Sequence, residues 1–383
     1  MNSLGILALL VVLLLGCPSK ESFVPPDVLY LYNTYQVGKN PTSINAQDFN
    51  GDGFADLITS NIRGNSLSIL FGKGDGGFED QVTFPACQEP RNLVIDDFNL
   101  DHEFDLAVAC SGDNHVLIFL GEGNGQFARG AEYPVQRTPV SIANGDYNED
   151  QLSDLVVALR NDKLQVFLGL GNGRFRLGPL YEYGDTPTSI MTDDLNQDGH
   201  LDLAVTNGGP MSSAVSIWLG VGDGSFKSPI DYRTGKRPLN VSFADFNSDR
   251  ILDLLVVNGQ MNTITIFLGN GDGTFQEGKD AGGDAGPNHA LAQDFDGDMV
   301  LDVAIVNIQS GNISLLYGKG DGTFRYPPKD YPTPQGPFAL TSLTVAAGRG
   351  EQPGIAIANN AASSVSIFLH HGLKARATTE PSS

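Results

Sequence analysis

Seven prolines recur at intervals of 48 to 51 residues, and this period restricts the possible fold more than any other feature of the sequence. They are Pro41, Pro90, Pro139, Pro187, Pro238, Pro287 and Pro337. A chain of 383 residues would ordinarily be expected to form two or three domains, but a fixed period near fifty residues is typical of a repeat architecture. We therefore predict seven structural units, near 41–89, 90–138, 139–186, 187–237, 238–286, 287–336 and 337–372.

Each unit contains four short apolar stretches separated by turns. The unit 238–286 shows the order: an alternating stretch at 239–244, an acidic loop at 245–253, an apolar run at 254–257, a second alternating run at 263–268 and a Gly-rich turn at 269–273. No helical periodicity is present, and a β-solenoid would need a much shorter period. Four short strands in a repeat of this length indicate a propeller blade. The predicted fold is all-β, a seven-bladed β-propeller of four-stranded antiparallel blades.

The two ends of the chain are expected to complete one blade together. The seventh unit stops after 365–369 and lacks an outer strand, whereas residues 28–37 form an unmatched copy of that strand. Tyr35 lies six residues before Pro41, and Tyr133, Tyr232 and Tyr331 precede their own prolines by the same distance. Pairing the N-terminal strand with the last blade closes the ring and leaves no exposed sheet edge. The propeller then spans 28–372, and the short polar tail 373–383 is predicted to be disordered.

An acidic pattern, D-x-[ND]-x-D-x-x-x-D, occupies the first loop of six units. The sets are Asp48, Asn50, Asp52 and Asp56; Asp97, Asn99, Asp101 and Asp105; Asp146, Asn148, Asp150 and Asp154; Asp194, Asn196, Asp198 and Asp202; Asp245, Asn247, Asp249 and Asp253; Asp294, Asp296, Asp298 and Asp302. The seventh unit, at 343–355, lacks such a set and is expected to hold no metal.

The spacing of these side chains predicts calcium sites. Oxygens at positions one, three, five and nine of a tight loop can converge on one point, with a backbone carbonyl near position seven filling a gap. An all-oxygen set favours Ca²⁺ over zinc or copper, and over the strict octahedron of Mg²⁺. Asp and Asn also cap turns, but that alternative explains one acid per turn rather than three. The sets contain 19 aspartates whose repulsion a cation would relieve, and six calcium ions would bring the net charge from −22 to −10.

The six loops differ at position six. Only the first and fourth have glycine there, Gly53 and Gly199, where a left-handed turn is easiest. The other loops carry His102, Gln151, Arg250 and Met299, and we expect them to bind calcium more weakly.

The pattern D-F-N-x-D-x-x-x-D-L at 245–254, with the run at 263–275, resembles the FG-GAP or VCBS repeat family. The resemblance covers roughly 28–372. It implies a propeller like that of integrin alpha subunits, with calcium loops on its lower face. Such repeats occur in adhesins, lectins, lyases and proteins without known activity, so the resemblance does not define a function.

The N-terminus predicts export. Residues 4–15 are almost wholly apolar but too short to span a bilayer comfortably, and they suit a signal peptide. Residues 14–17 resemble the lipobox of bacterial lipoproteins, which implies removal of 1–16, lipidation of Cys17 and a linker at 17–27. The missing basic residue near Met1 and the bulky Leu15 depart from that pattern, so an ordinary cleaved signal or a short membrane anchor is the alternative. The predicted location is the cell envelope, as a periplasmic or cell-surface lipoprotein, or the exterior.

Cys87 and Cys110 are the two cysteines of the mature chain. Cys87 precedes Pro90 by three residues and Cys110 follows Asp105 by five, which places both at the same end of the second unit. In an exported protein this predicts a disulfide, with two buried thiols as the alternative.

The net charge of −22 makes nucleic-acid binding unfavourable. Positive charge is concentrated on the face opposite the acidic loops, here called the upper face. The residues are Lys39, Arg63, Arg91, Arg137, Arg160, Lys236 and Arg237. We predict an anionic ligand there, a glycan or a protein, contacted by Arg91, Arg137, Lys236 and Arg237. Scattered solubilising charge is the alternative.

The sequence favours a non-enzymatic binding or adhesion module. His289 is the one histidine placed near the upper mouth, where a lyase base would stand with Arg91 or Arg237, although packing explains most such histidines. A polysaccharide lyase and a structural envelope component are the alternatives. An asparagine also recurs at the end of the second strand, and we expect it to bond backbone in a turn rather than to contact a ligand. These are Asn61, Asn207, Asn258, Asn307 and Asn359.

Overall fold

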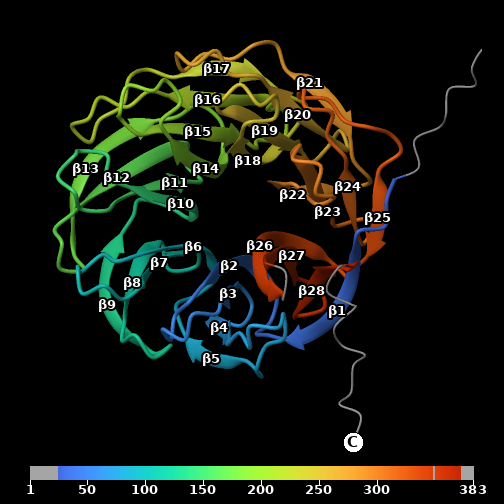
Figure 1. Ribbon diagram of the computed structural model, residues 1–383. Helices are drawn as coiled ribbons and strands as arrows, with labels where there is room; N and C mark the ends of the chain where they lie inside the picture. The colour runs from blue at the N-terminus through green and yellow to red at the C-terminus, as the bar shows by residue number, and fades with distance from the viewer. Residues whose placement is uncertain (1–24, 348–349, 372–383) are drawn as a thin grey trace, which may run out of the picture.

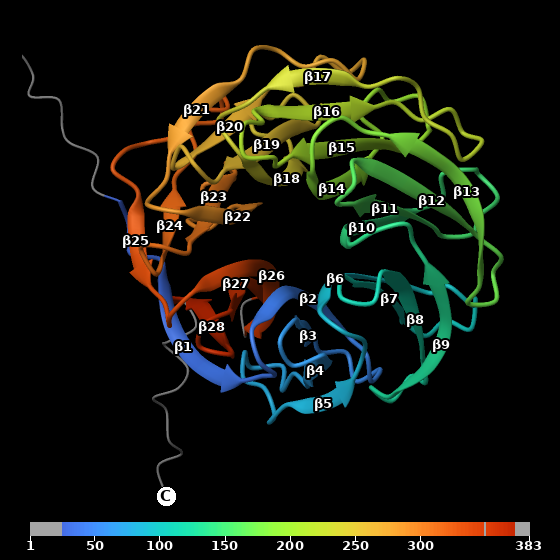
Figure 2. The same cartoon turned by 180° about the vertical axis from the view of Figure 1, so that it is seen from behind.

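The computed structural model describes residues 25–347 and 350–371, which form seven four-stranded antiparallel sheets around a central channel (Figures 1 and 2). From the channel outward, the first three blades are β2 (Pro41–Gln47), β3 (Asp56–Asn61), β4 (Ser66–Leu70) and β5 (Val82–Pro85); β6 (Pro90–Asp96), β7 (Asp105–Cys110), β8 (His115–Gly121) and β9 (Phe127–Pro134); and β10 (Pro139–Gly145), β11 (Asp154–Leu159), β12 (Lys163–Gly169) and β13 (Phe175–Glu182).

The next three blades are β14 (Pro187–Asp193), β15 (Asp202–Asn207), β16 (Ala214–Trp218) and β17 (Ile230–Arg233); β18 (Pro238–Ala244), β19 (Asp253–Asn258), β20 (Thr263–Phe267) and β21 (Lys279–Gly282); and β22 (Pro287–Gln293), β23 (Asp302–Asn307), β24 (Asn312–Leu316) and β25 (Lys329–Pro332). The seventh is β26 (Pro337–Ala347), β27 (Gly350–Asn359), β28 (Ser364–His370) and the N-terminal β1 (Leu29–Gln36).

This architecture confirms the predicted seven-bladed all-β propeller and its closure by the N-terminal strand. The predicted signal peptide 1–16, Cys17, linker residues 17–24 and the tail 373–383 lie outside the described residues. Within 25–347 and 350–371, no helix is long and apolar enough to cross a membrane.

The core lies between the blades. The second strand of each of the first six blades is buried along its whole length, because both of its faces are covered by other blades. One cluster shows the principle: Ala107 and Val116 of the second blade pack against Leu155 and Phe167 of the third. Side chains on alternate faces of a blade therefore belong to different inter-blade cores.

Every innermost strand begins with one of the seven prolines and has a β-bulge directly after that proline. The register shifts between the proline and the second residue after it in all seven blades, as between Pro90 and Asn92. Proline lacks an N–H and is tolerated at the start of a strand, and a bulge leaves one residue unpaired and redirects its side chain. The residue after each proline is thus released from the ladder at the upper end of the channel.

Side chains near these bulges link each blade to the next. The hydroxyl of Thr42 donates to the carbonyl of Arg91 at 2.8 Å, and the amide of Asn288 donates to the carbonyl of Phe338 at 2.6 Å. Equivalent bonds join the other junctions: Asn92 with Ile142, Ser141 with Ile190, Thr188 with Pro238, Asn240 with Ala290, and Asn360 with Pro41. All seven inter-blade junctions are therefore hydrogen-bonded at the inner strands.

The recurring asparagines at the ends of the second strands are buried, but the predicted bonding to backbone is wrong for most of them. The amide of Asn61 donates to the hydroxyls of Ser66 and Ser68 on the third strand, and Asn258 and Asn359 make the same contacts with Thr and Ser hydroxyls. They join the second strand to the third through side chains. The difference arises because the pairing strand supplies hydroxyls that face the asparagine.

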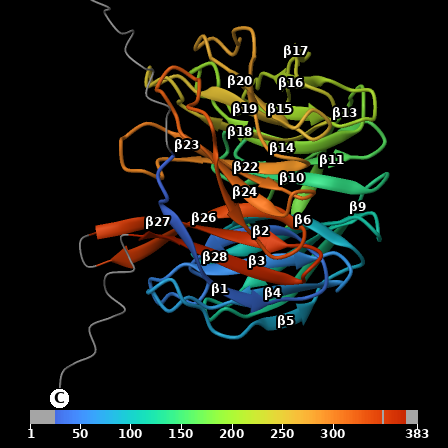
Figure 3. The ribbon, with the colours of Figure 1, turned by 90° about the vertical axis from the view of Figure 1, so that its right-hand side faces the viewer.

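The seventh blade differs at its lower end. Strands β26 and β27 stay paired as far as Ala347 and Gly350, where the other blades have acidic loops. The resulting hairpin projects beyond the body of the propeller (Figure 3).

Closure of the ring depends on Tyr331 of the sixth blade. Its hydroxyl accepts hydrogen bonds from the backbone N–H groups of Val28, at 3.0 Å, and Leu29, at 3.3 Å, in a buried setting. The replacement Tyr331→Phe leaves both donors unpaired, and we expect it to lower the free energy of unfolding by about 1–3 kcal/mol. It should also increase hydrogen exchange across residues 28–36.

Tyr232→Phe is the matched control, because it removes one similar bond, from Phe275 N–H at 3.1 Å, at a junction without chain ends. Equal exchange across residues 28–36 in both variants would contradict the role assigned to Tyr331.

Candidate functional site

The ninth aspartate of each acidic loop is a buried hydrogen-bond acceptor. It opens the second strand and is 0–1% exposed in all six loops. One carboxylate oxygen accepts from the N–H of the loop's second residue at 2.8–3.1 Å. The other accepts from a glycine N–H at the end of the third strand or just after it, at 2.7–2.9 Å. Each of these carboxylates therefore holds together three segments of its blade.

The other acidic side chains shape the loop itself. In the first loop, Asp48 accepts from the N–H groups of Gly51 and Gly53, both at 2.8 Å, and Asp52 accepts from the N–H of Phe54 at 2.9 Å. The amide of Asn50 donates to Asp52 at 3.0 Å. The other five loops repeat most of these bonds. The turn-capping alternative is thus part of the structure, and it leaves further oxygen lone pairs for a cation.

Two positions of every acidic loop have a left-handed backbone conformation, whereas the glycines in the sequence indicated such a conformation only at position six. Position six has positive φ in all six loops, including His102 at 72° and Met299 at 65°. Position four is also left-handed, from 59° at Glu149 to 82° at Gly297. The first loop alone has glycine at both positions, Gly51 and Gly53. Non-glycine residues adopt this conformation at a cost of about 1–2 kcal/mol each, so the chain tolerates strain here.

The ninth aspartates carry perturbed pKa values. Burial raises the pKa to about 6 for Asp56, Asp105, Asp154 and Asp202, and to about 7 for Asp302. The two N–H donors act in the opposite direction, and the neighbouring loop aspartates add a further rise. A cation bound among them would offset the burial and the repulsion together.

The donor set fits a hard cation. In the sixth loop, Asp294, Asp296 and Asp302 offer carboxylate oxygens that all lie within 4.8 Å of one another. In the other five loops, an asparagine oxygen takes the place of Asp296. The structure thus groups positions one, three and nine of the sixth loop, while Asp298 at position five is not part of that group; the full set at positions one, three, five and nine stays a prediction. The chemical contribution of Ca²⁺ would be charge neutralisation.

The acidic loops also contact the next blade. In four of the six loops, the second residue donates its N–H to the ninth aspartate and its carbonyl accepts from a glycine N–H of the following blade, as Tyr147 does from Gly224 at 2.8 Å. A Cβ on Gly224 would lie 3.5 Å from the Cβ of Asn148, so this glycine permits a close approach to the loop. His200 of the fourth loop also pairs with Glu149 of the third. Metal binding in one blade would thus be coupled to the position of its neighbour.

The central channel contains a cavity of about 500 Å³ lined by the seven innermost strands and their flanking turns. Of the seven basic residues expected on the upper face, only Arg91 and Arg160 line it. Arg137, Lys236 and Arg237 lie outside the cavity and are exposed. His289 lines the cavity with Arg91, while Arg237 does not join them. Burial lowers the pKa of His289 to about 4, so this side chain is neutral at physiological pH.

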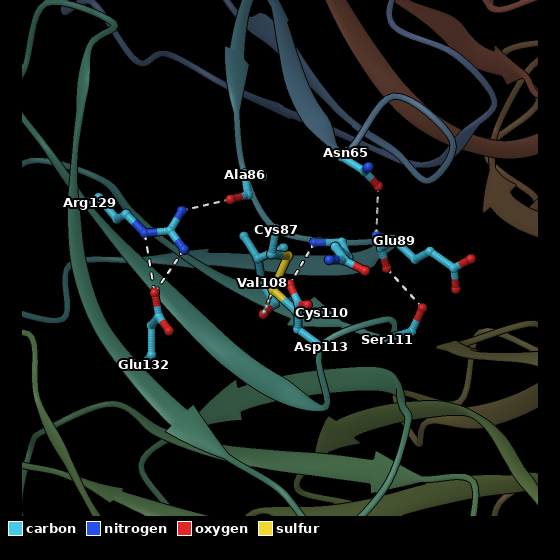
Figure 4. The surroundings of a disulfide bond; sticks show 11 residues. Asn65, Ala86, Cys87, Glu89, Val108, Cys110, Ser111, Asp113, Arg129 and Glu132 are labelled. Atoms are coloured by element: carbon cyan, nitrogen blue, oxygen red, sulfur yellow. Dashed lines mark hydrogen bonds and ion pairs between the residues drawn. A yellow bond between two sulfur atoms is a disulfide. The ribbon is translucent and has the colours of Figure 1, made fainter.

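A disulfide and several hydrogen bonds fix the segment that leads into Arg91 (Figure 4). Cys87 and Cys110 are bonded, with 5.8 Å between their Cα atoms. Glu89 donates its N–H to Asn65 at 3.0 Å, and the hydroxyl of Ser111 donates to the carbonyl of Glu89 at 2.8 Å. The covalent link and these bonds hold the start of β6, and with it the backbone of Arg91.

Sequence reasoning missed several residues of the channel. Ser242 and Asn45 both lie four residues after the proline of their blade and line the cavity, and Arg160 was counted only as surface charge. A fixed distance from each proline is the signal that would have found the first two. Arg160 follows a second strand, so no proline-based register identifies it.

The FG-GAP-like repeat model matches five overlapping segments: 48–108, 97–157, 146–205, 194–256 and 245–305. Together they span well over half of the chain. The search of curated protein sequences found no match to this chain.

Solved structures share the fold at low sequence identity. A crystal structure of BBS1N in complex with ARL6DN has a TM-score of 0.63 and 12% identity, covering 90% of this chain and 97% of that one. A catalytically inactive virginiamycin B lyase from Staphylococcus aureus, with quinupristin, has a TM-score of 0.59 and 14% identity, covering 89% and 98%. A functionally unknown protein from Desulfotomaculum acetoxidans has a TM-score of 0.56 and 13% identity, covering 78% and 90%.

Gly53 tests the left-handed loop conformation without steric interference. Its φ is 85° and no atom lies within 4 Å of a Cβ built there. We expect Gly53→Ala to lower the free energy of unfolding by about 1 kcal/mol, because alanine disfavours this conformation. Gly184→Ala is the control, since that site is equally open but not left-handed, and thermal melting should show no loss there. Equal losses would contradict the assignment of strain.

The raised pKa values predict an unusual acid response. With calcium chelated, the ninth aspartates bind protons more tightly in the folded chain, at a pKa of about 6, than at the ordinary 3.8. We therefore expect the melting temperature in chelator to rise as the pH falls from about 7.5 to about 5.5. With calcium present the same protonation competes with the metal, so the two melting curves should converge. A fall in chelator over this range would contradict the burial of these charges.

Proposed function

The chain belongs to the FG-GAP-like repeat family, and on this premise we propose that it is a calcium-binding propeller that acts as a binding module, recognising a glycan or a protein through its upper face.

Calcium binding is supported by six oxygen donor sets in one structural position. In each set, a buried aspartate with a raised pKa lies next to further aspartates. This buried aspartate also accepts hydrogen bonds from backbone N–H groups of its own blade. We infer that calcium relieves this repulsion and stiffens the lower face. The loop-to-blade hydrogen bonds would transmit the effect around the ring.

The observation that carries the binding role is the unpaired positive charge of the upper face. Within the part of the chain that the structure describes, none of the seven basic residues expected there forms an ion pair. The whole chain has a net charge of −22, so unpaired cations gathered at one end favour an anionic ligand. Arg137, Lys236 and Arg237 would form the rim of this surface.

Two further observations agree with a module of this kind. The similar propeller BBS1N was crystallised in complex with a protein, ARL6DN. The apolar stretch 4–15 and the lipobox-like residues 14–17 favour export and anchoring by lipid at Cys17, which would place the module in the cell envelope. Without lipidation, the same export would deliver a secreted form.

Native mass spectrometry of residues 18–383 tests the metal sites. We expect about six calcium ions, one for each acidic loop, and a large fall in melting temperature on chelation. Asp249→Asn should bind one ion fewer and still fold, because the amide oxygen can accept the Ile251 N–H that Asp249 now accepts at 2.8 Å. No bound ions and an unchanged melting curve would mean that the loops serve only as turns.

Retention on immobilised hyaluronate, with dextran as the neutral control, tests the upper face at fixed free calcium. We expect retention on hyaluronate without turnover, and a loss when Arg137, Lys236 and Arg237 are all replaced by glutamine. Absorbance from an unsaturated uronate product would instead favour the lyase alternative. Absence of retention would refute this surface as a site for acidic glycans and leave protein ligands or a structural envelope role.

A further inference from the structure

The cavity of the central channel is positively charged and has no acid in its wall. Among the described residues that line it, Arg91 and Arg160 are the charged side chains, and none is Asp or Glu. The remainder are hydroxyl, amide, imidazole and apolar groups. In a chain with almost twice as many acidic as basic residues, a cavity with only cations is unusual.

Arg91 is directed by the bulge at the start of β6. It is the unpaired residue between Pro90 and Asn92, and its carbonyl is already held by the hydroxyls of Thr42, at 2.8 Å, and Ser60, at 3.0 Å. The bulge residues of three other blades, Thr42, Thr188 and Asn288, use their side chains to reach the next blade. Arg91 makes no such bond and lines the cavity instead.

Three polar atoms in the cavity wall are buried without a hydrogen-bond partner. They are Nε of Arg91, Oγ of Ser242 and Nδ1 of His289, which come from the second, fifth and sixth blades. An unpaired buried polar group costs about 1–3 kcal/mol, so three such atoms behind the wall of one cavity mark a part of the channel where polar groups lack partners. His289 is neutral, which allows it to offer either a hydrogen or a lone pair.

The two arginines also repel each other. Burial and the charge of Arg160 both lower the pKa of Arg91, while Glu89 acts weakly in the opposite direction. The repulsion between the two guanidinium groups makes this pair unfavourable in an empty cavity. A bound anion would make it favourable, because guanidinium groups bind carboxylates in a planar, bidentate manner.

The size of the cavity and its uncharged side chains restrict the class of ligand that it can bind. A cavity of about 500 Å³ suits a small molecule rather than a protein segment. His289 and Asn45 can exchange hydrogen bonds with hydroxyl groups, and Phe243 and Phe338 supply apolar surface. Sugar rings with one carboxylate combine these features.

We propose that the central channel binds a single acidic sugar, with its carboxylate held by Arg91 and Arg160 and its hydroxyls facing Asn45 and His289. This proposal rests on the proposed function, because it specifies the ligand class of the same face. It separates the channel from the rim formed by Arg137, Lys236 and Arg237.

Titration calorimetry of the calcium-loaded protein with D-glucuronate, D-glucose and inorganic phosphate tests the proposal. We expect glucuronate to bind, glucose not to bind, and phosphate to bind more weakly than glucuronate. Arg91→Gln and Arg160→Gln should each weaken glucuronate binding by about tenfold or more, the loss expected for one charged hydrogen bond. Arg176→Gln, on the outer strand β13, is the control for the change in net charge and should leave the affinity unaltered.

The melting temperatures of the unliganded variants show whether a loss of glucuronate binding comes from a loss of folding. Because each replacement removes a like-charge repulsion, the unliganded Arg160→Gln and Arg91→Gln proteins should melt at the same temperature as the parent or higher. Full glucuronate affinity in both variants, or phosphate binding as tight as glucuronate, would overturn the proposal.

The failure of this proposal is distinguishable from failure of the proposed function. Retention on hyaluronate without any binding of glucuronate would overturn the channel site and leave the rim as the binding surface. Binding of glucuronate in the channel without retention on hyaluronate would support the channel site and count against recognition of polymers by the rim.

Discussion

The structure depends on a carboxylate buried at the start of the second strand of six blades. Each of these aspartates accepts one N–H from its own loop and one from a glycine at or just after the end of the third strand, so that it joins three segments of the blade. The arrangement is costly, because burial and neighbouring acids raise the pKa of the group. The proposed divalent cation in the loop would offset that cost and would account for the occurrence of the acids in sets rather than singly.

The two faces of the ring have different chemistry because the strands run in opposite directions. The lower face gathers the acidic loops and the glycine turns, and hydrogen bonds between them connect neighbouring blades. The upper face gathers the bulges that follow the seven prolines, with links from Thr42 to Arg91 and from Asn288 to Phe338. Hydrogen bonds between blades on both faces thus surround the channel that contains the cavity.

Closure is the least repetitive part of the propeller. The last blade has no acidic loop, takes its outer strand from the N-terminus, and extends as a hairpin where the other blades turn back. Tyr331 fixes the incoming chain by accepting two backbone N–H groups. The seventh blade is thus held by strand pairing and hydrogen bonding without an acidic loop.

The sequence by itself determined the repeating features of the fold. The seven units, the four strands of each, the acidic sets and the closing strand follow from proline, aspartate and tyrosine positions, because these residues act within their own turn or strand. Only the tertiary structure decided which distant residues meet. Arg91 and Arg160 share the channel while Arg137 and Arg237 do not, and Asn61 bonds hydroxyls rather than backbone. Side-chain direction at a bulge and the curvature of the ring set these contacts, and neither is expressed in a sequence period.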